Sequence, residues 1–184
     1  MEAYGAADDP AHCRIVLCAG ASVLNSKVES GVSLLTELLR DTLLNDAGKI
    51  FAILRQRRTA LAQQIGENGS AYAMTRAGAG FSAECAAEEY TGGIAYLRWL
   101  EELEEKGSGE LPALICVLQD LAGKLFSSAR LTLSVSTDED ASANRAADVL
   151  ARQLPAGAYE PPEACAVRPW GRRREGIVLP ADIS

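Results

Sequence analysis

The stretch "IGENGSAYAMTRAGAGFSAE", residues 65–84, decides how this fold is interpreted, because its glycines separate two long segments with helical spacing. A phosphate-binding loop needs a lysine among its final residues and a strand before it. "GAGFS" contains no lysine and follows a helical pattern. A dinucleotide fingerprint also fails, since Ala83 stands where the third glycine after Gly78 and Gly80 is required. We therefore interpret these glycines as a flexible connection between helices.

Helices are predicted on both sides of this connection. Residues 47–67 carry apolar side chains on one side, and residues 83–106 do so in their second half. Ser82 is expected to cap the second of these helices and Gly107 to end it, while Gly92 and Gly93 weaken its middle. Further helices are predicted over residues 26–44, 112–128 and 137–154, with capping-box spacing at Ser26/Glu29 and Thr137/Asp140.

Strands are predicted at "RIVL", from Arg14, and at "RLTLSVST", residues 130–137, where apolar and polar residues alternate. "GIVL", residues 176–179, is one further candidate. This order of elements indicates an α+β fold, in which helices are layered on one face of an antiparallel sheet that is incomplete. We expect a disordered segment at residues 1–12, an α+β domain at residues 13–157 and a connector at residues 158–184.

The composition restricts the classes of binding partner and the cellular compartment that are expected. The 184 residues are 48% hydrophobic and 23% charged, which allows a sizeable core, and the net charge of −7 disfavours nucleic acid and anionic membranes as partners. No apolar run approaches the length that spans a bilayer, and the first residues do not resemble a secretory signal. The five cysteines have no CxxC spacing, so we expect free thiols in the reducing cytoplasm.

The sequence offers no complete catalytic device. Zinc hydrolysis through H-E-x-x-H needs two imidazoles, and the chain contains one histidine, His12. A serine or cysteine nucleophile would also depend on His12, and Cys13 cannot form a dyad with it by adjacency alone. We therefore assign no catalytic, cofactor-binding or metal-binding residue to this chain.

Several charged clusters have a simpler interpretation than chemistry. Acidic pairs such as Glu88/Glu89 and Glu101/Glu102/Glu104/Glu105 have the chemistry for acid/base catalysis, but the helix "EELEEK" is better explained as a solvated face near a helix end. The basic groups "RQRR", residues 55–58, and "PWGRRRE", residues 169–175, have the chemistry to contact a phosphate or an acidic partner. We interpret both as solvated surface patches.

Residues 46–105 resemble the C-terminal half of presequence-protease-like zinc peptidases, a branch of the insulinase (pitrilysin) family. A pattern near "GHxxAxxRAxAxxS" is present as Gly69, Ser70, Ala73, Arg76, Ala77, Ala79 and Ser82. A second pattern, "GIxYxxFLxxLE", is present as Gly93, Ile94, Tyr96, Trp99, Leu100, Leu103 and Glu104. Residues 125–140 and 175–184 look like the family's helix-to-strand passage and the entry to its final domain. Ser70 and Gly80 depart from the pattern.

The resemblance implies a non-catalytic domain of a zinc-dependent oligopeptidase whose two halves enclose a chamber for unfolded peptides. The family's HxxEH motif lies in its N-terminal half, and its assisting arginine and tyrosine would lie beyond Ser184. We therefore expect the N-terminal catalytic half of the same polypeptide to be the partner and to bind zinc, while the isolated chain is inactive. A truncated sheet also predicts self-association.

Two alternatives stay open. One is a free-standing helical interaction module, and the other is a small cysteine-dependent enzyme. An in-frame HxxEH segment upstream of Met1 would favour the peptidase, whereas a true start at Met1 would favour the module.

Overall fold

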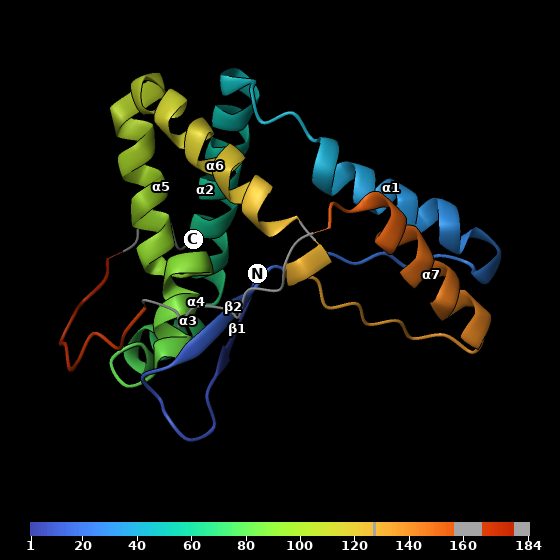
Figure 1. Ribbon diagram of the computed structural model, residues 1–184. Coiled ribbons are helices and arrows are strands. Elements are labelled where there is room, and N and C mark those ends of the chain that lie inside the picture. The colour runs from blue at the N-terminus through green and yellow to red at the C-terminus, as the bar shows by residue number, and fades with distance from the viewer. Residues whose placement is uncertain (127, 157–166, 179–184) are drawn as a thin grey trace. The chain divides into compact units, whose positions relative to one another are not determined.

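The computed structural model describes residues 1–126, 128–156 and 167–178, which are mostly helical with one two-stranded antiparallel sheet (Figure 1). The α+β fold class is confirmed. The chain divides into two compact units, here called unit 1 (residues 1–18, 47–111 and 163–184) and unit 2 (residues 19–46 and 112–162). The domain expected over residues 13–157 stays a prediction, and each unit has its own set of packed helices.

The sheet of unit 1 pairs β1 (Glu2–Gly5) with β2 (Cys13–Val16), and Gly5 lies opposite Cys13. Residues 1–12, expected to be disordered, thus contain a hydrogen-bonded strand. The sheet is covered by α4 (Ala83–Gly92), which packs against both strands. Ala83 and Ala87 are fully buried against Cys13, because their small side chains allow close approach.

The core of unit 1 lies between α2 (Ala47–Glu67) and α5 (Ile94–Lys106), which are side by side in Figure 1. The buried cluster consists of Leu61, Ile65, Ile94, Leu97 and Leu100. The apolar faces predicted for these two helices are confirmed. Gly107 ends α5 with a φ of 69°, in the left-handed region that glycine adopts without steric cost.

The glycine-rich connection is itself mostly helical, so its interpretation as a flexible connection was wrong. Helix α3 spans Gly69–Gly78, with glycines at its two ends. Between them stand alanines, Met74 and Arg76, all good helix formers. Tyr72 packs against the core cluster and ties α3 to it.

The helix predicted over residues 83–106 is divided at Gly93 into α4 and α5. Ser82 caps α4 as predicted, since its hydroxyl accepts hydrogen bonds from the amides of Glu84 and Cys85. A Cβ atom at Gly93 would lie 2.5 Å from Oε1 of Glu89. Glycine therefore permits a close contact at the junction that no other residue would.

Unit 2 contains α1 (Val28–Asp41), most of α6 (Leu111–Leu125) and α7 (Asp140–Gln153). Helices α1 and α7 pack against each other (Figure 1). Short 3-10 turns occur at Asn25–Lys27 and Ser128–Arg130, and a third, Gly107–Glu110, follows α5 in unit 1. Neither predicted capping box forms, because the N-cap positions of α1 and α7 are Lys27 and Glu139 and neither side chain makes a cap hydrogen bond.

The strand predicted over residues 130–137 is not formed. Residues 131–137 have no regular structure, and Leu131, Leu133 and Val135 are exposed. An alternating sequence forms a strand when a neighbouring strand pairs with it, and the described part of unit 2 contains none. The "GIVL" candidate is likewise not a strand over residues 176–178, and Leu179 lies outside the described residues.

None of the helices in the described ranges combines the length and the apolar character that crossing a membrane requires.

Candidate functional site

A groove of about 690 Å³ in unit 1 combines residues from α2, α3, α5 and the segment 167–178. We call it the arginine groove. Its apolar lining includes Ile65, Ile94 and Ile177, and its charged lining comprises Arg76, Arg172, Arg173, Arg174 and Glu175. It thus brings together the motif residues around Arg76 and the "GRRRE" segment, which are far apart in the sequence.

Arg76 is the best-connected charged residue of the groove. Its Nη1 donates a hydrogen bond to Oε2 of Glu89 at 2.8 Å, and its Nε donates to Oε2 of Glu175 at 2.6 Å. Its side chain is 10% exposed, and that of Glu89 is fully buried. Such a buried pair needs its geometry intact, because the desolvation of both charges is repaid only by their mutual contacts.

The electrostatics of this network follow from the same contacts. Burial alone would lower the pKa of Arg76, but hydrogen bonds to Glu175 and Glu89 outweigh burial, and the pKa is raised. The hydrogen bond from Arg76 lowers the pKa of Glu175 below its ordinary value. Both groups are therefore held in their charged forms at neutral pH.

Glu89 also organises the junction between α4 and α5. Its Oε2 accepts a hydrogen bond from the amide of Ala95 at 3.1 Å, in the first turn of α5. A carboxylate in this position satisfies a free amide and interacts favourably with the helix dipole. The other carboxylate oxygen, Oε1, has no hydrogen-bond partner in the described part of the chain.

Trp170 anchors the segment 167–178 to α3. Its backbone amide donates to the carbonyl of Ala79 at 2.9 Å. The guanidinium groups of Arg76 and Arg173 lie over its ring, 4.9 and 5.2 Å from the centroid, and Tyr90 meets it edge-on at 5.6 Å. Contacts of this kind contribute about 0.5–2 kcal/mol each.

Two glycines allow this anchoring. Gly171 has a φ of 74°, a conformation that residues with a Cβ atom rarely adopt. A Cβ atom at Gly80 would lie 2.8 Å from the carbonyl oxygen of Gly171. The departure from the family pattern at Gly80 thus has a physical reason, because a larger residue would push the segment away from α3.

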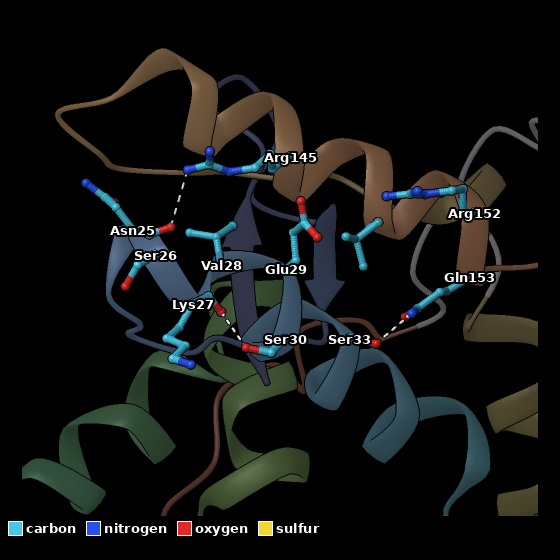
Figure 2. Close-up of a pocket in the computed structure, with 11 residues that line it drawn as sticks. Asn25, Ser26, Lys27, Val28, Glu29, Ser30, Ser33, Arg145, Arg152 and Gln153 are labelled. Atoms are coloured by element: carbon cyan, nitrogen blue, oxygen red, sulfur yellow. Dashed lines mark hydrogen bonds between the residues drawn. The ribbon is translucent and has the colours of Figure 1, made fainter.

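A second groove, of about 850 Å³, lies in unit 2 between α7 and the beginning of α1 (Figure 2). Two side chains of α7 connect it to the residues on the other side of this groove. Arg145 donates to the carbonyl of Asn25 at 3.3 Å, and Gln153 donates to the hydroxyl of Ser33 at 2.6 Å. Figure 2 shows Glu29 between Arg145 and Arg152. We interpret this groove as the seam between two packed helices, and it is the weaker candidate.

The other charged clusters from the sequence are engaged elsewhere. Arg55 and Arg58 of "RQRR" both form ion pairs with Glu104, and Arg57 lies over the ring of Tyr96. His12 bonds Asp9 at 2.6 Å through its Nδ1. Each of these side chains therefore has a structural contact, so its presence does not require a catalytic role.

The described residues do not offer a site for the zinc that the family resemblance implies. Within the described ranges, no group of three or more histidine, cysteine, aspartate or glutamate side chains is placed to hold a metal ion. We therefore derive no chemical step through zinc on this chain.

The family model for the peptidase M-16C associated region matches residues 1–103. The chain belongs to this peptidase-associated family. The resemblance identified from the motif residues is thus confirmed. The matched region contains all of α2, α3 and α4, and therefore the Arg76–Glu89 pair.

A curated relative is the mitochondrial presequence protease of Yarrowia lipolytica, which is 30% identical over 100 residues. That alignment covers 54% of this chain and 10% of the relative, so the peptidase-associated chain corresponds to a small part of the relative's length. No solved structure matches the chain significantly.

The sequence did not reveal the buried ion pair of Glu89 with Arg76 or the packing of the segment 167–178 against α3. Glu89 was considered only as a member of an acidic pair, although it follows the buried alanines of α4 on the same helix face and precedes Gly93 by four residues. The "PWGRRRE" cluster was interpreted as a surface patch in a connector. Trp170 followed directly by Gly171 is the sequence feature that could have indicated packing of this segment, because a large ring next to a flexible residue is easily buried against a helix.

Proposed function

We propose that this chain is a non-catalytic domain of a zinc-dependent oligopeptidase and forms part of the wall of its substrate chamber. The observation that carries the proposal is the match of residues 1–103 to the peptidase-associated family. In this proposal zinc is bound by the N-terminal catalytic half of the same polypeptide, and unfolded peptides are the substrates. The cytoplasmic compartment stays a prediction.

The arginine groove supports the chamber role. It lies within unit 1, which contains most of the matched region, and it offers both apolar and charged surface. An unfolded peptide exposes apolar side chains together with unpaired backbone groups. A groove that mixes isoleucines with arginines can contact both without requiring one sequence.

A second candidate function is a free-standing interaction module. The observation that favours it is the exposed apolar surface of unit 2, where Leu34 and Leu38 of α1 and Val117 and Leu121 of α6 are uncovered. The residues of each pair are four apart and so lie on one face of their helix, and contiguous exposed apolar surface marks interaction sites. The same surface would serve equally to contact another part of a larger peptidase.

The first experiment compares the complete reading frame that encodes this chain with the isolated 184 residues, using unfolded peptides with and without a chelator. We expect the complete protein to cleave the peptides, the chelator to stop cleavage, and the isolated chain to show none. Chelator-sensitive cleavage by the isolated chain would contradict the proposal. A reading frame that encodes no further domain would instead favour the interaction module.

The second experiment tests the chamber wall directly, with the photoreactive residue p-benzoylphenylalanine in the complete protein. One variant carries it at Phe81, which lines the arginine groove and is 63% exposed. The matched control carries it at Met74, which is 72% exposed on α3 and does not line the groove. We expect a bound peptide to be cross-linked from position 81 and not from position 74. Equal labelling, or none from position 81 in an active protein, would remove this surface from the chamber.

A further inference from the structure

We propose that the arginine groove is a binding site for acidic peptide segments, in which Arg172 and Arg174 contact carboxylates and the isoleucine lining contacts neighbouring apolar side chains. The inference rests on the proposed function for its setting, because it names the class of peptide that the chamber wall would hold. The site itself is a property of this chain and is measured on this chain.

The arginines of the groove outnumber the carboxylates that pair with them. Arg76 is paired with Glu89 and Glu175, and Arg173 lies 3.9 Å from the second carboxylate oxygen of Glu175. Arg172 and Arg174 have no carboxylate within ion-pair distance in the described part of the chain. Two exposed guanidinium groups are therefore available to a ligand, in a protein whose net charge is −7.

Arg172 and Arg174 extend from a backbone segment that is anchored on both sides. The segment is anchored on one side by the hydrogen bond from Trp170 to Ala79 and on the other by the bond between Arg76 and Glu175. Gly171 turns the chain against Gly80 between these anchors. Binding then costs little backbone entropy, because the part of the site that carries the charges is already ordered.

The chemistry of the groove lining favours a carboxylate ligand. A guanidinium group presents a planar set of donors that matches a carboxylate or a phosphate in two parallel hydrogen bonds. The apolar lining beside the arginines favours a ligand with apolar groups next to its charge, as in a peptide that combines glutamate with leucine or isoleucine. The groove volume of about 690 Å³ also lies in the range of about 300–1,000 Å³ that is usual for ligand sites.

The groove is poorly suited to nucleic acid. A nucleic acid strand requires an extended basic surface, and the overall negative charge repels a long polyanion. Single-stranded binding also relies on aromatic rings on which bases stack. The ring of Trp170 already has the guanidinium groups of Arg76 and Arg173 over it, so it does not offer that surface.

The experiment measures fluorescence anisotropy of labelled unfolded peptides with the purified 184-residue chain. One peptide combines glutamates with leucines, and a second has every glutamate replaced by glutamine. We expect binding of the acidic peptide that weakens with salt, and at least tenfold weaker binding of the glutamine peptide. The double variant Arg172→Ala/Arg174→Ala should weaken binding of the acidic peptide by about tenfold or more, because two charge-assisted hydrogen-bonding groups are lost.

The matched control is Arg14→Ala/Arg168→Ala, which removes two exposed arginines of unit 1 that do not line the groove. This control has the same net charge as the test variant, so it separates a site from general attraction, and it should bind like the parent chain. The variant Arg172→Lys/Arg174→Lys keeps the charge but loses the planar donors, and we expect intermediate binding.

Three outcomes would overturn the inference: equal binding of the two peptides, equal losses in the test and control variants, or tighter binding of a single-stranded oligonucleotide than of the acidic peptide. Binding and cleavage are separate measurements. If the chain does not bind the acidic peptide preferentially but the complete protein still cleaves peptides, the inference is wrong and the proposed function stands. Acidic-peptide binding without any cleavage by the complete protein would keep the site and remove the peptidase role.

Discussion

Glu89 connects three parts of unit 1 through one carboxylate. It pairs with Arg76 on α3, belongs to α4 and accepts the amide of Ala95 on α5. Because the side chain is fully buried, each of these contacts replaces water that the charge has lost. Arg76 extends the connection to Glu175, so the position of the segment 167–178 depends on the same network.

The first prediction concerns the substitution Arg76→Ala. It leaves the carboxylate of Glu89 buried without its cation, and we expect unit 1 to lose about 3 kcal/mol or more of its free energy of unfolding. Urea unfolding followed by circular dichroism measures this loss. The control is Arg55→Ala, which removes one exposed partner of Glu104 and should cost less than about 1 kcal/mol. Similar losses of unfolding free energy in the two variants would show that the buried pair contributes no more to stability than an exposed pair.

The second prediction is a pH dependence that arises from Glu175. Its pKa in the folded chain lies below the ordinary value of 4.5, because Arg76 donates a hydrogen bond to it. A lowered folded pKa means that the stabilising contribution is fully present above pH 4.5 and is lost as the pH falls through the folded pKa. We therefore expect the segment 167–178 to detach from α3 in this acidic range.

The emission of Trp170 reports this detachment, provided that Trp99 is first replaced by phenylalanine. The control adds Glu175→Gln, which removes the titrating carboxyl and should eliminate the step in emission below pH 4.5. An identical step in both proteins would assign the transition to other groups.

At the scale of elements, the junction between α4 and α5 depends on the close approach of Gly93 to Glu89. A Cβ atom at position 93 would lie 2.5 Å from Oε1 and 2.8 Å from Cα of Glu89, and the second of these atoms is backbone. The φ of Gly93 is −94°, so the constraint is steric and does not come from backbone strain.

The third prediction compares two neighbouring glycines. Gly93→Ala should destabilise unit 1 by about 1–3 kcal/mol, because α4 and α5 must move apart to admit the methyl group. Gly92→Ala meets no atom within 4 Å and lies in the last turn of α4, so it should be neutral or stabilise by up to about 1 kcal/mol. Thermal unfolding of both variants checks this order. A stabilised Gly93→Ala variant would contradict the steric argument.

The elements differ in how well the sequence predicts them. The faces of α2 and α5 were predicted because their apolar residues recur at helical spacing and face each other in the core. Helix α3 was missed, since glycines at 69 and 78 suggested a loop although the residues between them favour a helix. The strand at residues 130–137 was predicted from alternation, but pairing depends on a neighbour that a single segment does not reveal.

The same limit applies to the candidate site. The basic residues at 172–174 were noticed in the sequence, yet their partners come from α3, about a hundred positions earlier in the chain. No local pattern connects Arg76 with Glu175. The arginine groove follows from tertiary packing, and the sequence alone supplies its parts without their arrangement.

At the scale of the whole molecule, the two units differ in how completely they cover their apolar residues. In unit 1 the buried cluster of α2 and α5 is extended by Leu54, Tyr72 and Ile177. In unit 2 the buried apolar residues of the described ranges are Val28, Ala146 and Val149 alone, while Val117 of α6 is 61% exposed and Leu133 of the irregular segment is 41% exposed. We therefore expect unit 2 to drive self-association of the isolated chain.

The fourth prediction tests this assignment by sedimentation velocity over a range of concentrations. The variant Val117→Lys/Leu133→Lys should raise the dissociation constant of the self-associated species by about tenfold or more, because it removes two exposed apolar groups and adds charge repulsion. The matched control Ile53→Lys/Met74→Lys changes two apolar residues of unit 1 that are 63% and 72% exposed, and it should leave association unchanged. A chain that stays monomeric at high concentration would contradict the prediction. Equal effects of the two changes would show that unit 2 has no special part in association, and that net charge governs it instead.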